Sequence, residues 1–194
     1  MAKIKTYPAY IIMAVVILLD QATKILIRNT IPEGGWIIVG EKVFGDTFQI
    51  SHLMNDGAAF SLSLPNPLWN KAFFITTTVV AIFFILWLLH RATHKIQVVA
   101  FGMVLGGAIG NNLIDRPIFG AVTDFISIDI PNVIRGMDRF PVFNLADSAI
   151  FIAMCLLIID ILFIRDKVST ADRPETLPSN DNYKQGAIDE KSFS

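Results

Sequence analysis

The sequence contains a single cysteine, Cys155, among its 194 residues. One cysteine excludes an internal disulfide and a metal site built from several cysteines. Because Cys155 lies in the middle of an apolar run, it is expected to be a small hydrophobic residue rather than a nucleophile. The sequence also lacks a basic cluster interleaved with aromatic residues, and its formal net charge is -1. No nucleic-acid partner is therefore expected.

Charge is scarce over most of the chain. Ten of the 33 Asp, Glu, Lys and Arg residues fall in the last 29 positions, 166–194. Hydrophobic residues make up 53% of the sequence and the mean hydropathy is +0.55, whereas soluble domains contain about 45–50% apolar residues. The composition indicates a membrane protein. Residues 166–194 are polar, show no apolar periodicity and are expected to form a disordered tail.

Four apolar segments are long enough to cross a bilayer core, which requires about 20 helical residues. They lie at about residues 7–27, 68–89, 96–114 and 146–164. The first could pass for a secretory signal peptide, but it has no small-residue cleavage site and further spans follow it. It is interpreted as a retained span.

Basic residues predict the orientation of these spans. If four helices alternate, one side receives the link at 90–95 together with Lys3, Lys5, Arg165 and Lys167. The positive-inside rule makes that side cytoplasmic. Both termini, including the tail at 166–194, are therefore expected in the cytoplasm.

The two long connections are expected on the outer side. Residues 29–67 contain β-favouring runs at 36–39 and 48–53 between glycines and prolines. Residues 117–143 include a weakly alternating stretch at 122–130. The expected fold class is a mainly α membrane protein, in which residues 1–165 form four transmembrane helices with a small extracytoplasmic β platform.

Two aspartates are the first candidates for chemistry. Asp147 lies at the start of the fourth apolar run, and Asp124 lies just beyond the third. Acids at such positions are costly and are often functional, and two carboxylates brought together can share one proton and activate water. For Asp147, helix capping is an alternative of equal weight, because Asn144 is a favoured N-cap and an acid complements the helix dipole.

Other polar residues gather near helix ends. Asp20, Lys24 and Arg28 share a helix face, where an internal ion pair is favoured over direct participation in catalysis. The third span ends with a Gly-rich stretch that permits tight helix packing, followed by asparagines, Asp115 and Arg116. Interfacial anchoring is an alternative reading for Arg116 alone.

Together, these stretches resemble the lipoprotein signal peptidases (signal peptidase II), the membrane aspartyl peptidases of bacteria. The resemblance covers about residues 7–165 and consists of five boxes in the family's order: Asp20 to Lys24, Asn55 to Phe60, Gly106 to Arg116, Val122 to Asp124 and Asn144 to Asp147. Within the third box, the stretch Gly110-Asn111-Asn112 is one residue longer than the usual single Gly-Asn step. The family's asparagine could therefore be Asn111 or Asn112, and counting back from Asp115 favours Asn112.

This resemblance implies a catalytic pair, Asp124 and Asp147, in the bacterial inner membrane near the outer leaflet. It implies substrate contacts by Asn55, Gly57, Asn112, Arg116, Asn144 and Ala146, with Asp20, Lys24 and Asp115 supporting the fold. The expected substrates are prolipoproteins whose cysteine carries a diacylglyceryl group, cut on the amino side of that cysteine. Membrane lipids are the other expected partners of a monomeric enzyme without metal or cofactor. The outer loops are expected to move as substrate enters.

The rival hypothesis is a small ion- or proton-coupled transporter, whose acids also lie within helices. A transporter should show repeat symmetry and polar groups near the membrane midplane. This sequence has no internal repeat, and its polar boxes gather at the outward ends of the spans. The peptidase reading is therefore favoured.

Overall fold

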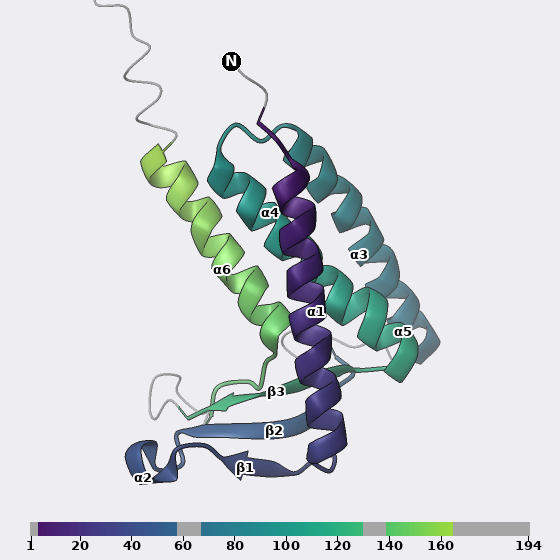
Figure 1. The fold of residues 1–194 in the computed structure, drawn as a ribbon. Coiled ribbons are helices and arrows are strands. Elements are labelled where there is room, and N and C mark those ends of the chain that lie inside the picture. The colour runs from purple at the N-terminus through teal and green to yellow at the C-terminus, as the bar shows by residue number, and fades with distance from the viewer. Residues whose placement is uncertain (1–3, 58–66, 130–138, 165–194) are drawn as a thin grey trace, which may run out of the picture. The chain divides into compact units, whose positions relative to one another are not determined.

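The computed structural model describes residues 4–57, 67–129 and 139–164 (Figure 1). The chain divides into two units, Met1–Asp160 and Ile161–Ser194, and of the second unit only residues 161–164 are described. The tail expected at 166–194 lies outside the described residues, as does the end of the Asn55 to Phe60 box.

Four helical segments are long and apolar enough to cross a membrane, namely Tyr7–Thr30, Lys71–His90, Lys95–Phe119 and Leu145–Phe163. They confirm the four predicted spans. The helices that form them are α1 (Tyr7–Thr30), α3 (Pro67–His90), α4 (Lys95–Ala108) with its continuation, and α6 (Leu145–Ile159) followed by a π-helical turn, η3 (Asp160–Ile164). Apolar side chains such as Leu18 and Phe83 are 68% and 69% exposed, which is what a lipid-facing surface requires.

The third span is not a single regular helix. After α4 the chain forms a π-helix, η2 (Ile109–Asp115), and then a short helix, α5 (Arg116–Phe119), which ends at Gly120 with φ 81°. A π-helix accommodates one extra residue in an α-helix and is frequent at functional sites. It lies on the stretch whose sequence is one residue longer than the family pattern.

Helix α4 packs against α1, α3 and α6, and glycine makes its close approaches possible. A Cβ at Gly102 would lie 2.6 Å from the Ala9 carbonyl oxygen on α1, and one at Gly107 would lie 2.6 Å from the Ala146 carbonyl oxygen on α6. These contacts confirm that the glycines allow tight helix packing. At the end of α4 remote from the sheet, His94 Nδ1 lies 2.7 Å from Asp160 Oδ1, which joins α4 to the end of the fourth span.

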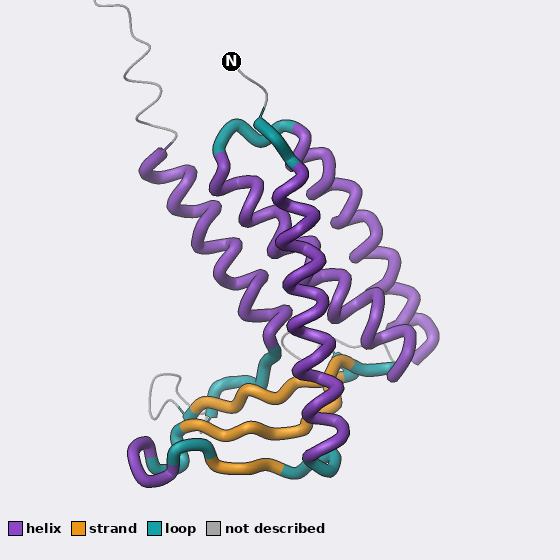
Figure 2. Tube along the Cα trace, viewed as in Figure 1, coloured by secondary structure: helices purple, strands orange, loops and turns teal. Residues whose placement is uncertain are grey.

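A three-stranded antiparallel sheet lies at the end of the helices where α1 ends and α6 begins (Figure 2). Its strands are β1 (Trp36–Ile38), β2 (Phe48–Asn55) and β3 (Val122–Ile128), in that order. A short helix, α2 (Glu41–Phe44), connects β1 to β2 and was not predicted. The mainly α fold class with a small β platform is thus confirmed.

The third strand differs from its predicted alternation. Residues 122–125 are all buried. Phe125 packs with Ile27 and Ile31 at the end of α1, while Thr123 and Asp124 accept hydrogen bonds from Arg28 and Asn144. The pairing of β2 with β3 sets Asn55 opposite Val122 and Leu53 opposite Asp124. Asp124, in the middle of β3, therefore lies next to Asn144 at the start of α6.

Candidate active site

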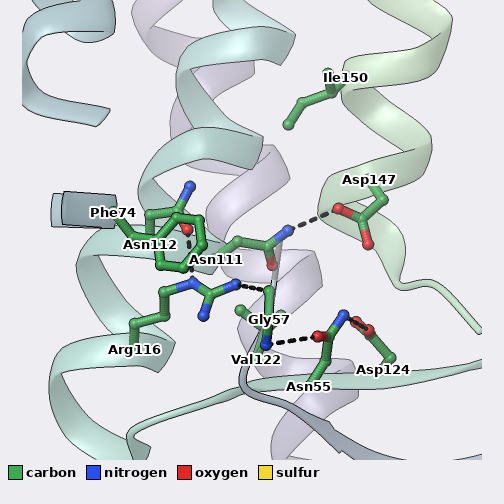
Figure 3. A pocket seen from close by; sticks show the side chains of 10 residues that line it. All are labelled: Asn55, Gly57, Phe74, Asn111, Asn112, Arg116, Val122, Asp124, Asp147 and Ile150. Atoms are coloured by element: carbon green, nitrogen blue, oxygen red, sulfur yellow. Dashed lines mark hydrogen bonds between the residues drawn. The ribbon is translucent and has the colours of Figure 1, made fainter. Parts of the chain in front are cut away.

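A cavity of about 240 Å³ opens between the sheet and the helix ends. Its wall combines carboxylates, amides and a guanidinium with three apolar side chains. Figure 3 shows the ten residues that line it: Asn55, Gly57, Phe74, Asn111, Asn112, Arg116, Val122, Asp124, Asp147 and Ile150. Both predicted aspartates therefore line one cavity, although they are 23 positions apart in the sequence.

Asp124 is held by two amide groups. Asn55 Nδ2 donates to Asp124 Oδ2 at 2.9 Å, and Asn144 Nδ2 donates to Asp124 Oδ1 at 2.7 Å. The side chain is almost completely buried. Burial, the largest effect, raises the pKa of Asp124 to about 6; the nearby Asp147 also raises it, while the hydrogen bonds from Asn55 and Asn144 and the charge of Lys24 lower it. An acid with a pKa in this range can hold or release a proton near neutral pH.

Asp147 lies in the first turn of α6 and takes part in a reciprocal cap. Its backbone N–H donates to Asn144 Oδ1 at 3.0 Å, and its own Oδ2 accepts from the Asn144 backbone N–H at 3.2 Å. The other oxygen, Oδ1, accepts from Asn111 Nδ2 at 2.8 Å. Sequence reasoning treated helix capping and catalysis as alternatives for Asp147. The structure shows the cap, and the capping carboxylate also lines the cavity, so capping does not remove Asp147 from the candidate site.

The adjacent residues Asn111 and Asn112 form hydrogen bonds with different neighbours. Asn111 contacts Asp147, whereas Asn112 Oδ1 accepts from Arg116 Nε at 2.9 Å. The Arg116 guanidinium also donates to the carbonyls of Asp56 and Gly57, at 3.0 and 2.6 Å, and lies 4.1 Å from the centroid of the Phe74 ring. Arg116 is thus buried in the site and does not serve as a surface anchor.

A buried ion network lies next to the cavity, where Lys24 contacts the lining residue Asn111. Lys24 Nζ lies 2.8 Å from Asp20 Oδ2 and 3.0 Å from Asp115 Oδ2, and all three side chains are fully buried. Arg28 adds a second cation, 2.9 Å from Asp115 Oδ1. Two acids and two bases balance, which a buried network requires.

This network also holds the strand that carries Asp124. The backbone N–H of Thr123 donates to Asp115 Oδ2 at 3.1 Å, and Arg28 Nε donates to Thr123 Oγ1 at 2.7 Å. Sequence reasoning placed Arg28 on the face of Asp20 and Lys24 but did not connect it to Thr123. The connection joins residues 95 positions apart, and no local pattern in the sequence signals it.

Two of the expected substrate contacts lie behind the cavity wall. Ala146 is fully buried, and its backbone N–H donates to Asp20 Oδ1 at 3.1 Å. Asn144 is fully buried as well, and its side-chain Nδ2 donates hydrogen bonds to Asp124 and Asn111. Of the residues not expected in the site, Phe74, Val122 and Ile150 provide its apolar walls.

The fold and the cavity define a multi-pass membrane protein with a polar, acid-containing site built at one end of its spans. The family described as signal peptidase (SPase) II matches residues 12–163. A lipoprotein signal peptidase of Maridesulfovibrio salexigens is 37% identical over 158 residues, which cover 80% of this chain and 95% of that protein. One from Ralstonia nicotianae is 40% identical over 145 residues, covering 74% and 78%.

Solved structures agree with these sequence matches. A bacterial membrane enzyme solved by the in meso method superimposes with a TM-score of 0.66 at 30% identity, covering 80% of this chain and 93% of the other. A second such enzyme gives a TM-score of 0.68 at 26% identity, covering 88% and 94%. The chain belongs to the signal peptidase II family, and it is a membrane peptidase, as the resemblance predicted.

Proposed function

We propose that this protein is a lipoprotein signal peptidase that removes the signal peptide from diacylglyceryl-modified prolipoproteins. It cuts on the amino side of the lipidated cysteine, and Asp124 and Asp147 activate the attacking water. The observation that carries this proposal is that both carboxylates lie on the wall of one cavity at the end of the membrane spans. The relatives described as lipoprotein signal peptidases support the substrate class.

The proposed reaction divides the work between two coupled acids. One carboxylate is ionised and takes a proton from water as the oxygen attacks the scissile carbonyl. The other is protonated and donates a hydrogen bond to that carbonyl. When the tetrahedral intermediate breaks, a proton passes to the departing amine of the lipidated cysteine. The released signal peptide keeps the new carboxyl group. The pKa of Asp124, about 6, supports a shared proton at neutral pH.

The polar residues around the pair position the substrate in this proposal. Asn55 and Asn144 orient Asp124 through their amides. Gly57, Asn112 and Arg116 provide the opposite wall, where Arg116 can exchange its hydrogen bonds to backbone carbonyls for bonds to the substrate backbone. Ala146 acts from behind the wall by keeping α6 in place, and Asp20, Lys24 and Asp115 support the site.

We place the site near the outer leaflet of the bacterial inner membrane, with both termini cytoplasmic and one chain sufficient for activity. Residues 1–165 then form the peptidase domain and residues 166–194 its cytoplasmic tail. A signal helix with a lipid-modified residue could reach the cavity laterally through the bilayer. Its acyl chains would add binding energy that positions the peptide bond.

The test is cleavage of a diacylglyceryl-modified prolipoprotein by purified wild type, Asp124→Asn and Asp147→Asn. Asparagine preserves shape and capping but cannot share the proton. Both variants should lose at least about 10³-fold in kcat while remaining folded, and Asp129→Asn, outside the cavity lining, should cleave like wild type. Near-normal cleavage by either folded variant would exclude that aspartate from the chemistry.

The orientation is tested separately by labelling with a membrane-impermeant maleimide. Single cysteines are placed at Val43, which is 76% exposed on α2, and at Ser194, in a Cys155→Ala background. In spheroplasts the cysteine at 43 should react and the one at 194 should react only after lysis. The reverse pattern would invert the proposed topology.

A further inference from the structure

Two adjacent asparagines line the cavity, and the π-helix η2 directs them to different partners. Asn111 is 7% exposed and lies between α1 and α6, where Lys24 Nζ donates to its Oδ1 at 2.6 Å and its Nδ2 donates to Asp147 Oδ1 at 2.8 Å. Asn112 instead accepts a hydrogen bond from Arg116 (Figure 3).

The charged neighbours determine which end of each amide points where. The ammonium of Lys24 and the Nε–H of Arg116 can only donate hydrogen bonds. The oxygen of Asn111 must therefore face Lys24, which leaves its NH₂ group to face Asp147. The oxygen of Asn112 must face Arg116. Asn111 consequently serves Asp147 as a donor, whereas Asn112 serves Arg116 as an acceptor.

The same oxygen of Asn111 links the two aspartates indirectly. It also accepts from Asn144 Nδ2 at 3.2 Å, and that amide donates to Asp124 at 2.7 Å. The Lys24 ammonium thus fixes the amide of Asn111. That amide donates to Asp147 itself and orients Asn144, which donates to Asp124. Asn112 has no part in this chain of contacts; through Arg116 it is joined instead to the carbonyls of Asp56 and Gly57.

We propose that the π-helix divides two tasks between these residues: Asn111 is a positioning residue for the aspartate pair, and Asn112 is a positioning residue for Arg116, which holds the carbonyls of Asp56 and Gly57. The division rests on the proposed function, since the first task concerns the rate of peptide cleavage and the second concerns substrate binding. It assigns Asn111, which counting along the sequence set aside in favour of Asn112, to the chemical step.

The same isosteric change at both positions separates the tasks. Asn111→Asp keeps the acceptor for Lys24 but replaces the donor to Asp147 by an oxygen. It should lower kcat by about tenfold to a hundredfold, the effect of one hydrogen bond to a charged group, with KM within about threefold of wild type. Asn112→Asp keeps the acceptor for Arg116 and adds charge to the binding wall, so it should raise KM severalfold and lower kcat by less than about threefold.

Two further variants make the comparison decisive. Asn29→Asp, the same change at an exposed position of α1, should behave like wild type. Asn111→Ala, which adds no charge beside Asp147, should reproduce the kcat loss. Gel filtration and the thermal unfolding midpoint in detergent report folding for each variant.

The division is overturned if the Asn111 variants cleave at the wild-type kcat, if both positions change the same kinetic constant, or if neither Asn111 variant folds while Asn112→Asp does. The last result would make Asn111 part of the packing core. Absence of cleavage by wild type would instead refute the proposed function, so the two failures are distinguishable.

Discussion

Replacing Gly107 by alanine should reduce catalysis by moving α6, although Gly107 does not line the cavity. A Cβ at this position would lie 2.6 Å from the Ala146 carbonyl oxygen and 2.7 Å from Ile150 Cγ1. Ordinary contact begins at 3.4 Å, so the backbone of α6 would have to retreat by about 0.8 Å, the difference between 3.4 and 2.6 Å. Backbone atoms cannot rotate away as a flexible side chain can.

The displacement falls next to Asp147, which follows Ala146 directly. A shift near 1 Å at reacting groups can cost about a hundredfold in rate, so Gly107→Ala should lower kcat by about tenfold to a hundredfold. Overpacking should also destabilise the protein by about 1–3 kcal/mol. The assays are cleavage of a diacylglyceryl-modified prolipoprotein and the thermal unfolding midpoint in detergent.

Gly102→Ala is the matched control on the same helix. Its Cβ would lie 2.6 Å from the Ala9 carbonyl oxygen on α1, the same overlap against a helix end remote from the cavity. It should lower the unfolding midpoint by a similar amount and leave kcat near wild type. Equal kcat losses in both variants, or a fully active Gly107→Ala, would refute the argument that α6 transmits the shift.

Two other measurements follow from the buried charges. The pKa of Asp124 in the folded protein, about 6, exceeds its ordinary value of 3.8. The folded state therefore favours the protonated carboxyl group, and this contribution to the free energy of unfolding is fully present below about pH 4. It is lost as the pH rises through 6, which lowers the free energy of unfolding by about 3 kcal/mol. Wild type should therefore show a falling unfolding midpoint over this range that Asp124→Asn lacks, and parallel pH profiles of the two proteins would contradict the assignment. Lys24→Met leaves Asp20 without its cation and should cost about 3–5 kcal/mol; an unchanged unfolding midpoint would show that the network does not stabilise the fold.

The helical part of the fold was predictable because its signal is local. Each span is a run of apolar residues of bilayer length, and the structure moves the predicted ends by a few residues. The first helix continues to Thr30 rather than ending near Ile27, because Arg28 finds buried partners in Asp115 and Thr123. A sequence pattern cannot report partners that lie so far along the chain.

The site was predictable in its residue types but not in its contacts. Asp124 and Asp147 were selected because acids are costly at the ends of apolar runs, and the cavity contains both. The choice of Asn112 over Asn111 rested on counting back from Asp115 along the sequence, whereas the structure gives the two asparagines different partners within a π-helix. Ala146 was expected at the substrate, but it lies against Asp20 because its backbone N–H belongs to the first turn of α6. Only the packing of α1, α4 and α6 resolves these positions.

The order of β1, β2 and β3 has a consequence for the biogenesis of the enzyme. Asp124 receives its hydrogen bonds from Asn55, at the end of β2, and from Asn144, at the start of the fourth span. One donor is synthesised long before the aspartate and the other well after it. A nascent chain halted after β3 would already contain Asp124 but only Asn55, one of the two residues that donate to it. Under the proposed function, the active site is therefore complete only once the fourth span has joined the other three.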